Sequence, residues 1–230
     1  MQGGSYDAIL VSPAKGEGPG ILLLQEIFGV NDFLLQKAEA LAELGYVVMC
    51  PDVFFRVEPH VSLPHDDASL EKAFTYMGRY AAEVDEETKV SDLVSGLRHL
   101  AGLPDTTGRG TGVMGYCLGG FLAYLTAAAG DPAVCVSYYG SGISDHLELA
   151  GDISCPVLFH FGGNDPYIAP EQVEAVRQAF SDRPDVTFHV ESDAGHAFEN
   201  LLAPRFSNPE AAARSWPVTV DWLSSHLPAG

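Results

Sequence analysis

The sequence predicts an α/β fold, with a doubly wound, mostly parallel central sheet and helices on both of its faces. Short runs of β-branched and aliphatic residues alternate along the chain with longer segments that repeat apolar residues at helical spacing. Some of these runs are continuously apolar, as in residues 21–24, which is typical of strands covered on both faces. Helices that follow strands in this regular way predict a parallel sheet with right-handed crossovers.

The individual elements follow from the same two patterns. The expected strands, in chain order, are residues 6–11, 21–25, 46–50, 112–115, 133–138, 157–161 and 186–190. The expected helices are residues 32–44, 86–100, 118–129, 170–180 and 210–227. The first helix has Asn31 as its N-cap and Gly45 as its C-terminal stop. Because no repeat, low-complexity segment or linker interrupts the pattern, we expect residues 1–230 to form a single domain.

One segment departs from the alternation and is expected to form a cap or lid, around residues 53–82. Its first part, residues 53–70, combines prolines with polar residues, which indicates a long excursion at the carboxyl edge of the sheet. The segment contains residue types that bind metals, namely His60, His65, Asp66 and Asp67. They lie on an irregular loop without a diagnostic spacing, so solvated loop residues are the preferred interpretation and we expect no metal.

Composition and charge exclude several classes of protein. Hydrophobic residues make up 47% of the chain and charged residues 19%, which is the balance of a packed globular protein rather than a disordered one. The net charge of −19, with basic residues scattered singly, would repel a phosphate backbone. We therefore expect no nucleic-acid partner.

The sequence also indicates where in the cell the protein is found and whether its cysteines form disulfides. The N-terminus lacks a basic segment followed by an apolar run, and no later stretch is long enough to cross a bilayer, so we expect a cytoplasmic protein with no membrane partner. Cys50, Cys135 and Cys155 lie in or beside apolar, strand-like runs. Buried free thiols are more common than disulfides in that setting.

The remaining cysteine, Cys117, is the candidate nucleophile. The motif Gly-Tyr-Cys-Leu-Gly at residues 115–119 follows an expected strand and opens an apolar helix, which is the context of a nucleophile elbow with cysteine in place of serine. Glycines are needed there because the sharp turn brings backbones close together. The amino end of the helix favours a thiolate. The alternative is a buried structural cysteine in a glycine-rich turn.

Asp165 and His196 are the candidate partners of this cysteine. Asp165 follows one expected strand, and His196 lies in a loop after the next, so the chain order Cys, Asp, His is that of α/β-hydrolases. His196 would transfer protons while Asp165 fixes its tautomer. Asp52 is a rival acid at another strand end, but it precedes the nucleophile. Structural or solvated roles suffice for the other histidines outside the cap, which are His99, His146, His160, His189 and His226.

These motifs resemble the dienelactone hydrolase family. The resemblance spans nearly the whole chain, through the segments 25–29 (Gln-Glu-Ile-Phe-Gly), 51–52 (Pro-Asp), 115–120 (Gly-Tyr-Cys-Leu-Gly-Gly), 163–165 (Gly-Asn-Asp) and 194–196 (Ala-Gly-His). It implies an α/β-hydrolase fold in which Glu26 contacts the nucleophile and helps to activate the thiol. It also implies that the backbone N–H groups of Ile27 and Leu118 form the oxyanion hole.

The resemblance has one departure that affects substrate choice. Relatives that cleave dienelactone carry an arginine four residues after the catalytic histidine, where it holds the substrate carboxylate, and this position is Asn200 here. A second arginine of the cap has no direct counterpart, although Arg56 and Arg79 lie in that region. We take Phe28, Asn200 and Arg79 as candidate substrate-binding residues, and we expect the anionic dienelactone to be a poor substrate.

The sequence therefore predicts a cysteine-dependent hydrolase of small carboxylic esters or lactones that passes through a thioester acyl-enzyme and needs no metal or organic cofactor. Its partner would be the small-molecule substrate, and the protein would be a monomer or a small homo-oligomer. Two alternatives remain open. One is a thioesterase or broad carboxylesterase on the same scaffold. The other is a ligand-binding relative without turnover, because fold does not imply function.

Overall fold

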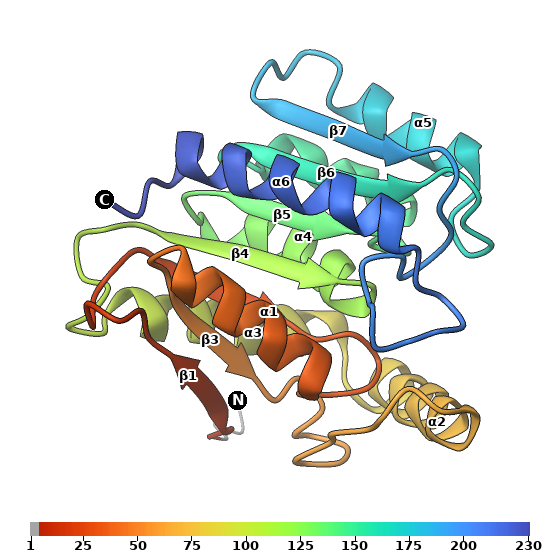
Figure 1. Ribbon diagram of the computed structural model, residues 1–230, viewed down its shortest axis with the longest axis horizontal. Coiled ribbons are helices and arrows are strands. Elements are labelled where there is room, and N and C mark those ends of the chain that lie inside the picture. The colour runs from red at the N-terminus through yellow and green to blue at the C-terminus, as the bar shows by residue number, and fades with distance from the viewer. Residues whose placement is uncertain (1–4) are drawn as a thin grey trace.

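A central sheet organises the protein, whose computed structural model describes residues 5–230. The sheet has seven strands in the order β1-β3-β2-β4-β5-β6-β7 (Figure 1). The strands are β1 (Ala8–Val11), β2 (Gly20–Leu24), β3 (Val47–Pro51), β4 (Thr111–Tyr116), β5 (Cys135–Tyr138), β6 (Val157–Gly162) and β7 (Val186–Glu191). Among the strands of the described residues, only β1 runs antiparallel to its neighbour. This confirms the predicted α/β class and each expected strand, with ends shifted by at most two residues.

Helices cover both faces of the sheet, as the doubly wound pattern predicts. The helices are α1 (Asp32–Glu43), α2 (Asp67–Glu83), α3 (Glu86–Ala101), α4 (Leu118–Gly130), α5 (Pro170–Ala179) and α6 (Pro209–His226), with short 3₁₀ turns at Ile143–Asp145 and Leu147–Asp152. In Figure 1, α1 and α6 lie on one face, and α3, α4 and α5 lie on the other. None of the helices within residues 5–230 is long and apolar enough to cross a membrane.

The capping of α1 shows how local sequence sets these boundaries. The side chain of Asn31 accepts a hydrogen bond from the backbone N–H of Leu34 at 3.3 Å, which is the expected N-cap contact. Gly45 has φ = +103°, a conformation that favours glycine, and it follows the C-cap residue Leu44. Both sequence-predicted signals are therefore confirmed.

Sheet register places two chemical groups side by side. Strands β2 and β4 are adjacent and parallel, and Leu24 of β2 pairs with Gly115 of β4. Glu26 and Cys117 each lie two residues beyond these partners. Because parallel strands end at the same edge of a sheet, the carboxylate and the thiol emerge together at the carboxyl edge.

The cap segment consists of an irregular loop followed by α2. Its sequence spacing was not recognised as helical, but Asp66 accepts a hydrogen bond from the backbone N–H of Ser69 at 2.7 Å and caps a helix of 17 residues. Figure 1 shows α2 beyond the strand ends, at the edge where the sheet finishes. The four histidines and aspartates of this segment have separate surroundings: His60 is exposed near Asp7, the side chain of His65 is buried, Asp66 caps α2 and Asp67 pairs with Arg205.

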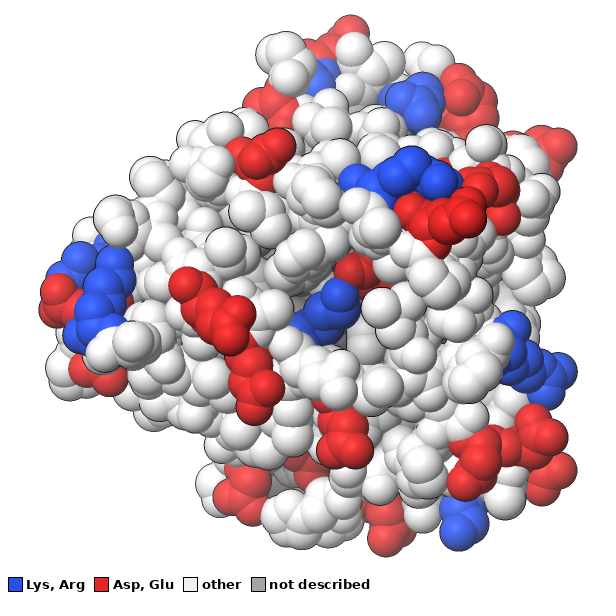
Figure 2. Space-filling view, viewed as in Figure 1, with Lys and Arg blue, Asp and Glu red and all other residues white. Residues whose placement is uncertain are grey.

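The surface has no basic stripe on the face that Figure 2 shows. Lys and Arg atoms form small, separate groups there, most of them beside acidic side chains. This agrees with the net charge of −19.

Candidate active site

Cys117 lies in a sharp turn between β4 and α4. Its backbone has φ = +56° and ψ = −116°, a strained conformation for a residue with a side chain. A Cβ atom on Gly115 would lie 2.0 Å from the backbone oxygen of Gly119, and one on Gly119 would lie 2.3 Å from that of Leu24. Glycine is therefore required at both positions, and the turn presents Cys117 as the N-cap of α4.

Asp165 and His196 follow β6 and β7 and form a hydrogen-bonded chain with Cys117. Nε2 of His196 lies 3.0 Å from Sγ of Cys117, and Nδ1 lies 2.7 Å from Oδ2 of Asp165. The other carboxylate oxygen of Asp165 accepts the backbone N–H of Tyr167 at 2.8 Å, which fixes the carboxylate in place. The structure thus brings together the three residues that the sequence selected.

The electrostatics of this chain favour a protonated imidazole on His196. Burial lowers the pKa of His196, but the adjacent Cys117 and the Asp165 carboxylate outweigh it and raise this pKa well above its usual value. A protonated imidazole beside the sulfur stabilises a thiolate. The amino end of α4 acts in the same direction, because helix N-termini carry partial positive charge.

Asp52, the alternative acid, has a structural environment. Its two carboxylate oxygens accept the backbone N–H groups of Phe54 at 3.1 Å and of His60 at 2.6 Å. Burial raises the pKa of Asp52, and these backbone hydrogen bonds oppose that shift. Asp52 therefore holds the start of the cap loop, whereas Asp165 is the acid that contacts His196.

Glu26 lines the same cavity as Cys117 and is buried. Its carboxylate accepts hydrogen bonds from the side-chain amide of Asn200 at 2.7 Å and from the hydroxyl of Tyr139 at 3.4 Å. Within residues 5–230, Glu26 makes no hydrogen bond to Cys117, whose sulfur is hydrogen-bonded to His196. In this conformation, Glu26 and Cys117 therefore share a cavity without a hydrogen bond between them among the described residues.

Two backbone amides beside the nucleophile are free. The N–H groups of Ile27 and Leu118 have no hydrogen-bond acceptor within the described part of the chain. Leu118 is the first residue of α4, where an N–H lacks an intrahelical partner, and Ile27 lies in the turn after β2. Free amides of this kind can bind a developing negative charge on oxygen.

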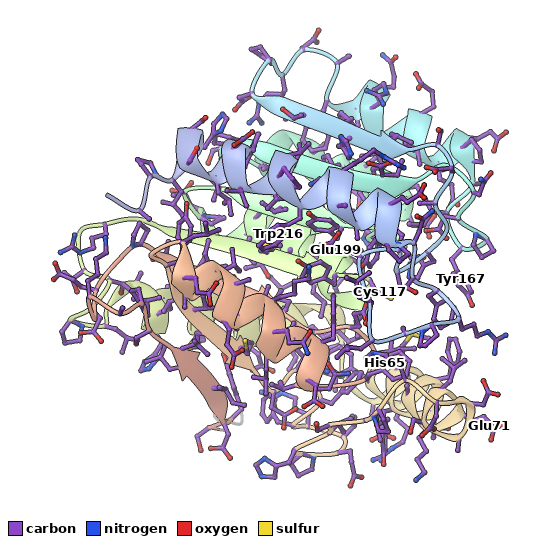
Figure 3. The ribbon with its side chains drawn as sticks, viewed as in Figure 1. His65, Glu71, Cys117, Tyr167, Glu199 and Trp216 are labelled. Carbon is purple, nitrogen blue, oxygen red and sulfur yellow. The ribbon has the colours of Figure 1, made fainter. Side chains whose placement is uncertain are left out.

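An apolar cavity of about 140 Å³ opens onto the thiol and the imidazole. One face of α2 contributes Leu70, Phe74 and Met77, which repeat at helical spacing. Its other lining residues are Glu26, Ile27, Phe28, Cys117, Ser141, Tyr167, His196, Ala197, Asn200, Ala203 and Phe206. No lysine or arginine lines the cavity, considering residues 5–230. Figure 3 shows Cys117 near the end of the sheet, above His65 and to the left of Tyr167.

Arg79, the one arginine taken as a candidate substrate-binding residue, does not line this cavity, and neither does Arg56. Arg79 follows Leu70 by nine residues and therefore projects from the opposite side of α2. It pairs with Glu83 at 2.9 Å and with Glu58 at 3.5 Å. Arg56 is bound to Asp92 through two hydrogen bonds, of 2.6 and 2.7 Å.

The other two candidate substrate-binding residues do line the cavity. Phe28 is buried there with its ring 4.4 Å from that of His65. Asn200 is fully buried, and its amide nitrogen lies within hydrogen-bond distance of Glu26 and of His65. Its oxygen accepts the backbone N–H of Leu202 at 3.1 Å. Asn200 therefore serves the polar network around Glu26 instead of offering a free group to a substrate carboxylate.

A buried ion pair anchors the loop that carries His196. Glu199 is ion-paired with Lys37 of α1 and accepts the hydroxyl of Ser215 of α6 at 2.7 Å. Burial raises the pKa of Glu199, and Lys37 opposes the shift. The ring of Trp216 lies 4.5 Å from the Lys37 ammonium, and Figure 3 shows Trp216 beside Glu199. These contacts connect the loop to helices on one face of the sheet.

Several site residues were not identified from the sequence. His65 was read as a loop residue, although it contacts the Glu26 network. Tyr139 has φ = +39°, and its ring lies 5.2 Å from that of His196. Tyr167 approaches the same imidazole edge-on at 5.0 Å. The spacing of apolar residues in α2 was the one sequence signal that would have placed the cap helix against the site.

Comparisons with known proteins find relatives over nearly the whole chain. The sequence model of the dienelactone hydrolase family matches residues 6–227. The chain is 38% identical over 229 residues to a carboxymethylenebutenolidase from Pseudomonas sp. strain P51, covering 99% of this chain and 93% of that protein. It is 34% identical over 230 residues to the carboxymethylenebutenolidase of Rhodococcus opacus, covering 95% and 86%.

Solved structures also show similarity to dienelactone hydrolases over nearly the whole chain. A putative dienelactone hydrolase from Klebsiella pneumoniae subsp. pneumoniae is similar with a TM-score of 0.80 and 25% identity, over 97% of this chain and 94% of that one. The sheet topology and the turn at Cys117 thus define a hydrolase of the α/β-hydrolase fold. More specifically, the chain belongs to the dienelactone hydrolase family.

Proposed function

We propose that this protein is a cysteine-dependent hydrolase of small carboxylic esters or lactones that forms a thioester acyl-enzyme with Cys117. The observation that carries the proposal is the arrangement at the strained turn, where Sγ of Cys117 lies 3.0 Å from Nε2 of His196 and Nδ1 of His196 lies 2.7 Å from Asp165. Nucleophile, base and orienting acid within hydrogen-bond reach are the elements of nucleophilic acyl transfer.

The reaction would proceed in two halves. The Cys117 thiolate attacks the carbonyl carbon, the tetrahedral intermediate expels the alkoxide, and His196 gives that oxygen its proton. A water molecule then attacks the thioester, His196 accepts a proton from the water, and the thiolate leaves as the carboxylic acid is released. Asp165 holds the imidazole in the tautomer that both transfers require.

Two further groups would support these steps. The free N–H groups of Ile27 and Leu118 would donate to the oxyanion of each tetrahedral intermediate. Glu26 is a second carboxylate in the cavity, and we expect it to assist thiol ionisation by accepting the thiol proton and passing it on to His196, which then delivers this one proton to the leaving alkoxide. A metal or organic cofactor has no step in this scheme.

The cavity favours uncharged substrates. Its walls are largely apolar, the described lining contains no lysine or arginine, and Glu26 places a carboxylate inside it. An anionic acyl group would lose hydration without gaining a cationic partner. A neutral ester or lactone with a small apolar acyl group is the substrate class that this lining supports.

A stopped-flow and mass-spectrometric experiment tests the proposal. Mixing the protein with p-nitrophenyl acetate should give a burst of p-nitrophenol, then steady release, and one acetyl group on the peptide that contains Cys117. Cys117→Ala should abolish both phases. A protein that merely binds ligands would release at most one equivalent, and comparison of lactone, ester and acyl-thioester substrates would reveal a thioesterase.

A further inference from the structure

His65 reaches the active site from the cap loop because two loops pair with each other. Gly29 and Ser62 form an antiparallel bridge, and the backbone N–H of Leu63 donates to the oxygen of Phe28 at 2.9 Å. This short pairing places His65 against the turn that follows β2. Only 5% of its side chain is exposed.

The ring of His65 contacts the polar network around Glu26. Nε2 of His65 lies 2.9 Å from the amide nitrogen of Asn200, 3.3 Å from that of Asn31 and 3.7 Å from Oε2 of Glu26. A side-chain amide nitrogen only donates hydrogen bonds, so Nε2 is the acceptor and the ring proton lies on Nδ1.

Asn200 connects the ring to the carboxylate. Its amide nitrogen carries two hydrogens, and its partners are Oε2 of Glu26 at 2.7 Å and Nε2 of His65 at 2.9 Å. Since the amide is planar, an acceptor for one hydrogen fixes the direction of the other. Glu26 has no lysine or arginine within 4 Å, among the residues from 5 onward, so neutral donors alone hold this buried carboxylate.

We infer that His65 is a positioning residue that acts through Asn200 to hold the Glu26 carboxylate beside Cys117. The inference rests on the proposed function, because it assigns His65 to the same reaction. Without the acceptor on His65, only Glu26 and the backbone N–H of Leu202 hold the Asn200 amide, and the shortest hydrogen bond to the Glu26 carboxylate is weakened. A displacement of this group by about 1 Å would slow the reaction by roughly 10- to 100-fold.

Two substitutions separate the acceptor from the ring. His65→Gln keeps an acceptor for Asn200 but removes the aromatic contact with Phe28, whereas His65→Phe keeps the aromatic contact and removes the acceptor. We expect kcat to fall roughly 10- to 100-fold in His65→Phe, with KM little changed, and to stay within about threefold in His65→Gln. A packing role predicts the reverse order, with the larger loss in the glutamine variant, and would overturn the inference.

A double-substitution cycle tests whether His65 acts through Glu26. Glu26→Gln combined with His65→Phe should be no slower than Glu26→Gln alone, because the second change has no carboxylate left to misplace. If the double variant is slower than Glu26→Gln by the same factor that His65→Phe causes in the wild-type protein, the two residues act independently and the inference is wrong. His60→Asn is the matched control, since His60 lies in the same loop, is exposed and should leave kcat unchanged.

Cys117→Ala, measured on the same neutral ester, keeps the two proposals apart. Activity that survives Cys117→Ala contradicts the proposed function. If Cys117→Ala is inactive while His65→Phe retains the wild-type kcat, the proposed function stands and the inference about His65 is wrong.

Discussion

The four cysteines differ in what surrounds their sulfur atoms, and all are free. Burial raises the pKa of Cys50 and of Cys155 to about 12, and it raises the pKa of Cys135 well above its usual value. Cys117 is partly exposed and lies against His196. At pH 7 we expect iodoacetamide to alkylate Cys117 roughly 10²-fold faster than the other three, with parallel loss of activity. Peptide mapping measures this, and labelling of another cysteine with activity intact would contradict it.

The carboxylate of Glu26 is bound by hydrogen-bond donors that a glutamine would also satisfy in part. Glu26→Gln keeps the size of the side chain and removes its capacity to accept a proton. If Glu26 assists thiol ionisation, kcat/KM should fall by roughly 10²–10⁴-fold, while the melting temperature changes little. Both quantities should be measured on one preparation. A destabilised variant with nearly wild-type kcat/KM would assign Glu26 a structural role.

At the scale of elements, α2 supplies part of the apolar lining of the cavity. The helix presents Leu70, Phe74 and Met77 to the site and projects Arg79 to the other side. Met77→Arg would place a cation in the lining. We expect it to raise the ratio of kcat/KM for an anionic lactone over that for a matched neutral ester by about tenfold, since one charge contact in a partly buried site contributes about 1.4 kcal/mol.

Arg79→Met is the matched control for that helix, because it removes a cation from the face that does not line the cavity. The substrate ratio should stay at its wild-type value, which itself should favour the neutral ester. A wild-type protein that prefers the anionic lactone would show that a cationic group reaches the substrate in spite of the lining.

The same helix shows where prediction from sequence stops. The strands and the hydrogen-bonded chain of Cys117, His196 and Asp165 could be predicted because apolar runs, glycine turns and chain order are local signals. The apolar stripe of α2 is narrow and follows a proline-containing loop, so its helical spacing was not recognised. The position of His65 depends on a bridge between two loops, which leaves no periodic trace in the sequence.

At the scale of the whole molecule, His160 of β6 is a titratable group buried between the sheet and α6. Its ring stacks on that of Tyr138 of β5, at 4.0 Å, and Nε2 lies 2.8 Å from the hydroxyl of Thr219 of α6. On β7, His189 lies 5.1 Å away, ring to ring. Burial, aided by His189, lowers the pKa of His160 well below its usual value. The folded protein therefore holds this histidine neutral, whereas the unfolded chain protonates it near pH 6.5.

This difference makes folding stability depend on pH. Below about pH 6.5 the unfolded chain binds one more proton at this position than the folded protein, so the contribution of His160 to folding stability is complete above that pH and is lost as the pH falls.

His160→Gln keeps a donor for Thr219 and does not titrate. Relative to this variant, the wild-type free energy of unfolding should fall by up to about 1.4 kcal/mol per pH unit between pH 6.5 and 5. Urea unfolding of both proteins measures the difference, in which the shifts of His196, Asp52 and Glu199 cancel because both proteins contain them. If the free energies of unfolding of the two proteins change equally with pH, His160 becomes protonated in the folded protein, and the inferred difference between the folded and unfolded states is wrong.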